Sequence, residues 1–272
     1  KREGADLVIG TDPDCDRVGI AARKSDGEFA LLTGNQTGAV LLDYVINARK
    51  RSGTLPENAC VVKTIVTSEI ATRICKANGV AIENVLTGFK YIGEKLQHYL
   101  DSGEHTFLMG YEESYGYLFG DYARDKDACV ASMMIAEAAA YYRSRDMTVY
   151  DALMSVFERY GFSVEKTLNL VMPGLDGAEK MKKMMQGLRS EPPKDIGGVS
   201  VLSVKDYSQG LDGLPKANVL SFALEEGSTL IVRPSGTEPK VKVYIMTSGK
   251  DEAEAKAKEE RLETGFKEKH AN

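Results

Sequence analysis

Short apolar runs alternate with amphipathic stretches over residues 1–160. Six runs are short and rich in Val, Ile and Leu, and they predict strands at 5–10, 18–22, 29–32, 60–66, 80–86 and 106–109. Apolar residues at helical spacing predict helices at 36–50, 68–78 (with Ser68 as its cap), 91–100, 128–143 and 149–160. Strands that alternate with helices indicate an α/β domain with a mixed, mostly parallel sheet flanked by helices.

The pattern changes near Gly161. Strands predicted at 162–171, 199–205, 219–224, 229–232 and 241–247 are accompanied by only two predicted helices, at 177–189 and 252–269. This order indicates an α+β domain built on an antiparallel meander. We therefore place a domain boundary near residue 160.

Composition narrows the possible partners. The formal net charge of −5 gives no reason to expect nucleic acid as a partner. No apolar run approaches the roughly 20 residues of a membrane helix, so we expect no membrane partner. The chain has four scattered cysteines and three scattered histidines without a CxxC pair, which argues against structural zinc and fits reduced thiols in the cytoplasm. Because it begins with Lys1 rather than Met, we expect a piece of a longer protein.

An acidic loop follows the first predicted strand. Asp12, Asp14 and Asp16 occupy alternate positions, and Arg17 comes next. In an extended loop alternate side chains point the same way, and aligned carboxylates repel one another unless a cation lies between them. A hard divalent cation such as Mg²⁺ prefers oxygen ligands, so we expect a magnesium site here.

Three other interpretations of this loop can be weighed. A calcium EF-hand loop needs Gly at its sixth position and Glu at its twelfth, where this chain has Arg17 and Arg23. A haloacid-dehalogenase-type phosphatase would use Asp12 as its nucleophile, but the fifth motif residue is Asp16 rather than Thr or Val. The remaining alternative is a polar surface turn.

A second motif, RPSGTEPK at residues 233–240, lies between two predicted strands. Its glycine and small hydroxyl residues let backbone N–H groups converge on an anion, and Arg233 adds a bidentate phosphate donor. Lys240 and Lys242 share one face if the next segment is a strand. The motif indicates a phosphate-binding loop, although the same residues also suit an ordinary hairpin turn.

Two further loops follow predicted strands, where parallel sheets bind ligands. Glu112 and Ser114 in GYEESYG offer groups for sugar hydroxyls, but the segment also suits a helix start with acidic residues near its N-terminus. Lys90 in TGFK can transfer protons if its pKa is lowered. Lys90, and Lys126 in the charged cluster 124–127, are by themselves equally typical of a solvated surface.

Taken together and in order, TDPDCDR, TGFKYIG, GYEESYG and RPSGTEPKVKVY resemble the metal-binding, lysine, sugar-recognition and phosphate-binding loops of the α-D-phosphohexomutase family. GFKYIGEK, GYEESYGYLFGD and RDKDA are most similar to its phosphoglucomutase/phosphopentomutase-like branch. The resemblance implies the end of domain two at 1–30, the α/β domain three at 31–160, and a TATA-binding-protein-like domain four at 161–272.

The resemblance also implies an activity. Members of the family interconvert sugar 1-phosphates and 6-phosphates, here of glucose or mannose, through an enzyme phosphoserine and a bisphosphate such as glucose 1,6-bisphosphate. The phosphoserine belongs to a T-x-S-H-N-P loop in the first domain, and no Ser-His-Asn string occurs in these 272 residues. We therefore expect this chain to be inactive by itself and to work with N-terminal domains of the same polypeptide.

Roles follow from the matched motifs. Asp12, Asp14 and Asp16 would bind Mg²⁺, and Arg17 and Lys90 would act at the transferred phosphoryl group and the reacting hydroxyl. The substrate would be bound by Glu112, Ser114, Lys126, Arg233, Ser235, Gly236, Thr237 and Lys240.

The chain departs from the family pattern at two places. Cys15 occupies a position where a small residue is usual, and Lys240 and Lys242 stand where relatives use Arg. The alternatives to a mutase are a metal-dependent phosphatase with Asp12 as nucleophile and a non-catalytic module that binds metal or phosphate.

Overall fold

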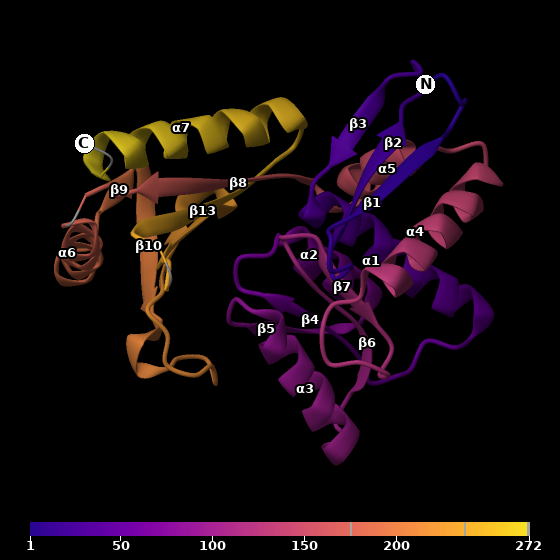
Figure 1. Cartoon of the computed structure of the whole chain (residues 1–272), viewed down its shortest axis with the longest axis horizontal. Coiled ribbons are helices and arrows are strands. Elements are labelled where there is room, and N and C mark those ends of the chain that lie inside the picture. The colour runs from indigo at the N-terminus through magenta and orange to yellow at the C-terminus, as the bar shows by residue number, and fades with distance from the viewer. Residues whose placement is uncertain (175, 237, 271–272) are drawn as a thin grey trace. The chain divides into compact units, whose positions relative to one another are not determined.

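A computed structural model describes residues 1–174, 176–236 and 238–270 (Figure 1). The chain divides into two compact units, Lys1–Tyr160 and Gly161–Asn272. The first unit contains two sheets and the second contains one, and each unit has its own cluster of buried apolar side chains.

The first unit opens with a small antiparallel sheet. Its strands are β1 (Leu7–Thr11), β2 (Val18–Arg23) and β3 (Phe29–Leu32), in that spatial order. Thr11 is paired with Val18, so the acidic segment between them is the loop of a β-hairpin. The strands predicted at 5–10 and 18–22 are confirmed, and they pair antiparallel.

A four-stranded sheet follows in the same unit, with the order β5-β4-β6-β7. It consists of β4 (Ala59–Thr64), β5 (Ala81–Val85), β6 (Thr106–Glu112) and β7 (Gly116–Phe119). The first three strands are parallel and β7 is antiparallel to β6. The expectation of a mixed, mostly parallel sheet is confirmed.

Strand β7 was not predicted from the sequence. Residues 113–115 make a tight turn in which Tyr115 has φ of +67°, a left-handed conformation that carries no signal in a Tyr. The chain therefore reverses directly from β6 into β7. The alternative of a helix start in this segment is wrong.

Five helices belong to the first unit. The side chain of Thr33 accepts from the Gln36 N–H while Gln36 accepts from the Thr33 N–H, a capping box that starts the first of these helices. Asp127 caps the fourth. The five helices are α1 (Gly34–Ser52), α2 (Ile70–Asn78), α3 (Phe89–Ser102), α4 (Ala128–Arg143) and α5 (Val149–Tyr160).

The prediction that Ser68 is the N-cap of α2 is wrong by one residue. Glu69 occupies that position and its side chain makes no capping bond. Ser68 precedes it, and its hydroxyl accepts a hydrogen bond from the Ile70 N–H at 3.3 Å. The helix starts later because Thr67 is still engaged in a turn, in which its N–H donates to the Thr64 carbonyl.

Helix α3 covers one face of the parallel sheet (Figure 1). Cys60 and Val62 of β4 pack against Ile92 and Leu96 of this helix, and all four are fully buried. The helix also lies close to the β7–α4 loop. A β-carbon built on Gly93 would come within 2.2 Å of the Arg124 carbonyl oxygen.

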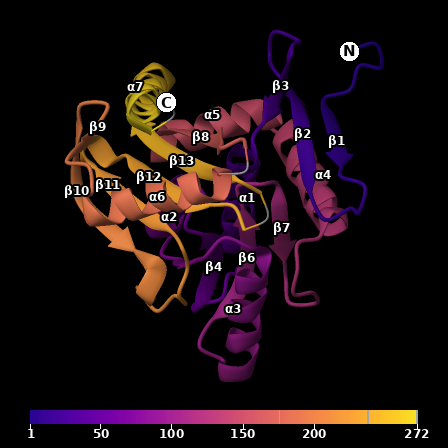
Figure 2. The same cartoon turned by 60° about the vertical axis from the view of Figure 1, so that its left-hand side comes forward.

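The second unit contains one antiparallel sheet with the order β8-β13-β12-β11-β10-β9 (Figure 2). The expected meander is present from β9 to β13, but the first strand of the unit, β8, joins at the far edge beside β13. The strands are β8 (Phe162–Val171), β9 (Asp195–Ile196), β10 (Val199–Asp206), β11 (Leu220–Leu224), β12 (Thr229–Pro234) and β13 (Lys240–Gly249).

Two helices, α6 (Gly177–Ser190) and α7 (Glu252–His270), accompany this sheet, together with the short 3₁₀ turns η1 (Tyr207–Gln209) and η2 (Glu225–Gly227). Met185 of α6 and Phe266 of α7 belong to the same buried cluster as the inward side chains of the strands. The helices therefore share one face of the sheet, and the α+β expectation is confirmed.

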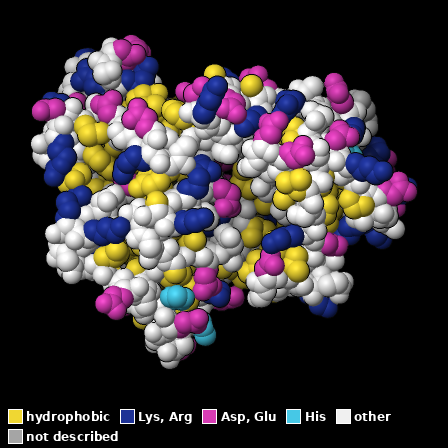
Figure 3. All heavy atoms as spheres, turned by 180° about the vertical axis from the view of Figure 1, so that it is seen from behind, with side chains coloured by type: hydrophobic (Ala, Val, Ile, Leu, Met, Phe, Trp, Pro, Cys, Tyr) yellow, Lys and Arg dark blue, Asp and Glu magenta, His cyan; other side chains and the backbone are white. Residues whose placement is uncertain are grey.

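Charges of both signs are interspersed over the face of the molecule in Figure 3. Within the described residues, every helix is too short or too polar to cross a membrane.

The close approach at Gly93 leads to a first prediction. Gly93→Ala should lower the free energy of unfolding by about 1–3 kcal/mol, because the added methyl group overpacks the contact with the Arg124 carbonyl. Urea unfolding followed by circular dichroism measures this change.

Gly187→Ala in α6 is the matched control, since a β-carbon there meets nothing within 4 Å. It should instead raise the stability by about 0.5–1 kcal/mol, the usual gain for Ala in a helix interior. Equal effects of the two substitutions would contradict the packing argument.

Candidate functional site

The acidic loop joins β1 to β2. One carboxylate oxygen from each of Asp12, Asp14 and Asp16 lies within 4.8 Å of the others. Asp12 Oδ1 accepts hydrogen bonds from the backbone N–H groups of Asp16 (3.1 Å) and Arg17 (2.9 Å). The bond from the Arg17 N–H is the main cause of a lowered pKa at Asp12. Asp12 is therefore held ionised and in a fixed orientation.

Lys126, in the loop between β7 and α4, reaches the same carboxylates. Its Nζ lies 2.6 Å from Asp16 Oδ2, and its side chain is only 12% exposed. Burial opposes the charged form of this lysine, but the bond to Asp16 outweighs it and raises the pKa of Lys126. The other oxygen, Asp16 Oδ1, is buried and has no hydrogen-bond partner among the described residues.

Glu112, the last residue of β6, lies beside this loop. Its carboxylate is 3.8 Å from Arg17 Nη2 and its side chain is 8% exposed. Burial raises the pKa of Glu112, while the Ser114 hydroxyl and the charge of Arg17 act in the opposite direction. A β-carbon on Gly116 would lie 2.7 Å from Lys126 Cδ and 3.0 Å from Glu112 Cγ, so the glycine lets both side chains approach.

Backbone hydrogen bonds hold these segments together. The Val18 N–H donates to the Tyr115 carbonyl at 3.1 Å, which joins the start of β2 to the β6–β7 turn. The Ala128 N–H donates to the Cys15 carbonyl at 3.2 Å, which joins the acidic loop to the first turn of α4. The structure thus brings together seven of the residues singled out in the sequence: Asp12, Asp14, Asp16, Arg17, Glu112, Ser114 and Lys126.

Lys90 is not connected to this group. It lies in the first turn of α3, after the carboxyl end of β5, and is exposed. Its Nζ is 4.7 Å from the ring centroid of Tyr91. Within the described part of the chain its ammonium group makes no hydrogen bond or ion pair. Lys90 and Glu112 share only the edge of the sheet, since Glu112 ends β6, Lys90 follows β5, and both strands are parallel to β4.

The candidate phosphate loop belongs to the second unit and connects β12 to β13. Arg233 lies near the end of β12 and Lys240 begins β13. The Ser235 N–H donates to the Lys240 carbonyl at 2.8 Å, and Lys240 is ion-paired with Glu238. The predicted contact residue Thr237 lies outside the described residues.

This loop lines a pocket together with α6. Ser235 and Gly236 form one wall, and Lys182 and Arg189 form part of the other. Arg189 is oriented by an ion pair of 3.1 Å with Asp206. Lys182 and Arg189 are seven residues apart in the predicted helix, which places them on one face. That spacing is the signal that sequence analysis overlooked.

A third residue missed by sequence analysis is Lys63. It lies inside the apolar strand β4 and is fully buried, with its Nζ 3.0 Å from the Thr67 carbonyl and 2.9 Å from Glu69 Oε1. Burial alone would raise the pKa of Glu69, but the pairing with Lys63 outweighs this effect and lowers it. The one sequence signal for Lys63 was a charged residue within an apolar run. The pair shapes the turn that follows β4, at the same edge of the sheet as Glu112.

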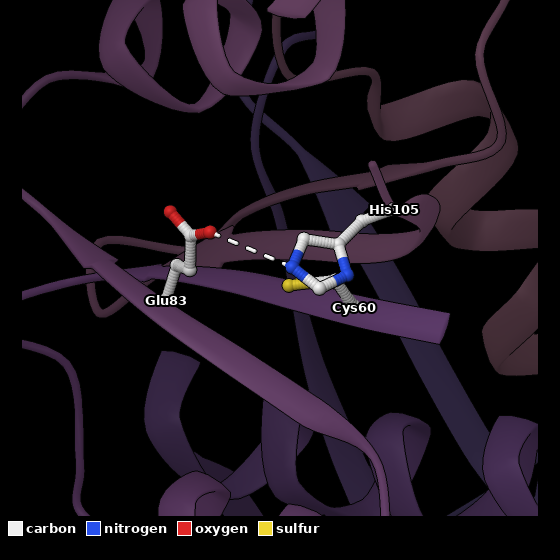
Figure 4. A group of neighbouring side chains, drawn as sticks. All are labelled: Cys60, Glu83 and His105. Carbon is white, nitrogen blue, oxygen red and sulfur yellow. Dashed lines mark ion pairs between the residues drawn. The ribbon is translucent and has the colours of Figure 1, made fainter. Parts of the chain in front are cut away.

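Another group of side chains that could bind a metal ion lies at the other end of β4 and consists of Cys60, Glu83 and His105 (Figure 4). Glu83 is balanced by Lys95 at 2.5 Å, and the Cys60 thiol is 3.5 Å from the Tyr99 hydroxyl. Burial raises the pKa of Cys60 to about 11, so the thiol is neutral at pH 7. These groups already have partners, whereas the acidic loop sets three carboxylates against one lysine. The acidic loop therefore has the larger share of unbalanced negative charge.

Comparison with known proteins agrees with this fold and site. The description "Phosphoglucomutase/phosphomannomutase, alpha/beta/alpha domain III" matches residues 33–160, and "Phosphoglucomutase/phosphomannomutase, C-terminal domain" matches residues 177–263. The chain belongs to the α-D-phosphohexomutase family.

Curated relatives of this chain are named phosphoglucomutase. A phosphoglucomutase from Staphylococcus epidermidis is 37% identical over 255 residues, which cover 90% of this chain and 45% of that protein. The chain thus spans a little under half of the length of the curated relatives that it matches.

Solved structures show the same fold at low identity. Parafusin, a Paramecium phosphoglucomutase, has a TM-score of 0.69 at 19% identity, covering 96% of this chain and 44% of its own. An Aspergillus fumigatus N-acetylphosphoglucosamine mutase, solved with GlcNAc-6P and magnesium, has a TM-score of 0.54 at 14% identity, covering 97% of this chain and 49% of its own.

The buried Glu112 gives a second prediction. Because its pKa is raised in the folded chain, folding favours the protonated form. Its contribution to stability is therefore greatest below the unfolded pKa and is lost as the pH rises through the folded pKa. Glu112→Gln should raise the urea midpoint at pH 7, and the gain should disappear at about pH 4, near the ordinary pKa of a glutamate.

Glu57→Gln, at an exposed position, serves as the control and should show no such pH-dependent difference. A loss of stability in Glu112→Gln at pH 7 would mean that the ion pair with Arg17 outweighs the cost of burial.

Proposed function

We propose that this chain provides the metal-binding, sugar-binding and phosphate-binding parts of a phosphoglucomutase/phosphomannomutase. The complete enzyme would interconvert the 1-phosphate and 6-phosphate of glucose or mannose in the cytoplasm, through an enzyme phosphoserine and a bisphosphate intermediate. The observation that carries this proposal is the convergence of the three aspartates with Arg17 and Glu112 at one place. Family membership and the names of the relatives support it.

Asp12, Asp14 and Asp16 fit a Mg²⁺ ion. They supply only oxygen ligands, and the unpartnered Asp16 Oδ1 is the kind of orphaned acceptor that a cation satisfies. When bound, the metal would neutralise negative charge on the transferred phosphoryl group. The magnesium in the Aspergillus mutase structure supports this assignment.

Two cations beside the loop would hold phosphoryl oxygens. Arg17 is 47% exposed and 3.8 Å from Glu112, so its guanidinium keeps donors available for a ligand. Lys126 stays protonated because Asp16 raises its pKa, and it would bind the substrate as a cation. We assign Lys90 to proton transfer or charge stabilisation at the reacting hydroxyl, from the edge of the sheet that it shares with Glu112.

Sugar recognition would fall to Glu112 and Ser114. A buried carboxylate and a neighbouring hydroxyl accept and donate hydrogen bonds to a pair of sugar hydroxyls. In the second unit, Arg233, Ser235, Gly236, Thr237 and Lys240 would hold the phosphate that is not transferred. Lys182 and Arg189 add positive charge to the pocket beside this loop.

The metal assignment gives a third prediction. Asp16→Asn should weaken Mn²⁺ binding at least about tenfold, equivalent to about 1.4 kcal/mol, because it removes one of three anionic ligands. Electron paramagnetic resonance of free Mn²⁺ measures the affinity, and competition by Mg²⁺ establishes the relevance to magnesium.

Asp26→Asn is the matched control. Asp26 is an exposed aspartate in the β2–β3 turn, where it pairs with Lys24. Because this residue takes no part in the acidic loop, the Asp26→Asn variant should bind Mn²⁺ as tightly as the unsubstituted chain. Equal affinity in all three proteins would contradict a metal site in the acidic loop.

A fourth prediction concerns turnover. The phosphoserine would come from outside these 272 residues, because the sequence contains no Ser-His-Asn string. The chain should therefore leave glucose 1-phosphate and mannose 1-phosphate unchanged, even with Mg²⁺ and glucose 1,6-bisphosphate, in a coupled assay for the 6-phosphates. Release of inorganic phosphate together with phosphorylated Asp12, detected by mass spectrometry, would instead favour a phosphatase.

A further inference from the structure

Two cysteines meet beside the acidic loop. Cys15 lies within the loop, between Asp14 and Asp16, and Cys129 lies in the first turn of α4. They are 114 residues apart in sequence, yet their Sγ atoms are 3.7 Å apart. The hydrogen bond from the Ala128 N–H to the Cys15 carbonyl holds the two backbones side by side. The two thiols are thus held close together at the point where the acidic loop attaches to α4.

The four cysteines differ in exposure. Cys129 is exposed and Cys15 is partly exposed, whereas Cys60 and Cys75 are fully buried. A solution oxidant can therefore reach the pair beside the acidic loop and not the two cysteines in the core. Since a disulfide needs about 2.05 Å between sulfurs, the thiols at 3.7 Å must approach by about 1.7 Å, within reach of side-chain rotation.

We propose that Cys15 and Cys129 form a redox modification site, in which a hydroperoxide converts the two thiols into a disulfide that ties the acidic loop to α4. In the first step one thiol attacks the peroxide, the O–O bond breaks, and a sulfenic acid and an alcohol or water form. In the second step the other thiol attacks the sulfenyl sulfur, the S–O bond breaks and water leaves. Two thiols are oxidised and one hydroperoxide is reduced.

A consequence for metal binding rests on the proposed function. The three aspartate oxygens that would hold a cation lie within 4.8 Å of one another, and their closure onto one ion depends on a small adjustment of the loop. A disulfide at the residue between Asp14 and Asp16 restricts that adjustment. Oxidation therefore weakens the affinity of the loop for a divalent cation.

Peptide mapping tests the modification directly. Trypsin places each cysteine in a separate peptide, with Cys15 in 3–17, Cys129 in 127–143, Cys60 in 52–63 and Cys75 in 74–76. The folded chain is treated with hydrogen peroxide, blocked with N-ethylmaleimide after unfolding, and digested without reductant. We expect peptides 3–17 and 127–143 to be joined with the loss of two hydrogens, and the other two to carry the blocking group.

Cys129→Ser and Cys75→Ser are matched variants. The first should abolish the cross-link and the second should leave it intact. Separate sulfinic acids on Cys15 and Cys129, links between chains, or links to Cys60 or Cys75 would overturn the proposal.

Mn²⁺ titration tests the consequence. The oxidised chain should bind Mn²⁺ at least about fivefold more weakly than the reduced chain, a difference of about 1 kcal/mol, and dithiothreitol should restore the affinity. Cys129→Ser should not respond to peroxide. Unchanged affinity in a fully cross-linked chain overturns this consequence, whereas failure of the reduced chain to bind Mn²⁺ counts against the proposed function instead.

Discussion

Two backbone hydrogen bonds hold the candidate site together. They run from Val18 to the Tyr115 carbonyl and from Ala128 to the Cys15 carbonyl, and they fasten a hairpin loop near the start of the chain to a turn and a helix about a hundred residues later. Both acceptor residues have positive φ, which costs a non-glycine residue about 1–2 kcal/mol. The surrounding contacts must outweigh that cost, so the β6–β7 turn and α4 hold the loop in position together with the hydrogen bonds that Asp12 makes within the loop.

Charge is the second constraint. Two unit charges of like sign 4 Å apart repel by about 4 kcal/mol at an effective dielectric constant of 20. The acidic loop sets Asp12, Asp14 and Asp16 against Lys126, and burial adds a further penalty at Glu112. The first unit thus concentrates negative charge that Lys126 and Arg17 balance only in part. A cation or a cationic group stabilises such a site. Gathering like charges for function at a cost in stability is a common compromise in proteins.

The sequence predicted most of the fold because apolar periodicity is a local property. The elements that it missed lacked that signal: β7 has four residues after a left-handed Tyr115, and β9 has two. The same distinction between local and tertiary signals applies to the residues of the candidate site. Contiguous motifs revealed the aspartates and Glu112, whereas the pairing of Lys126 with Asp16 depends on tertiary packing that no local pattern encodes. Lys63 stood out locally as a charge within an apolar run, but its pairing with Glu69 likewise appears only in the folded chain.

The acidic loop and the phosphate loop belong to different units, each with its own buried core. Each loop is therefore positioned by the core of its own unit. In the proposed reaction the ligand carries a phosphate at either end and has to present each end in turn to one acidic centre. Under that proposal a separate phosphate clamp would suit this need, because it would hold whichever phosphate is not reacting while Glu112 and Ser114 would bind the sugar hydroxyls. In the proposed function, specificity for the sugar would reside in the first unit and tolerance of both orientations in the second.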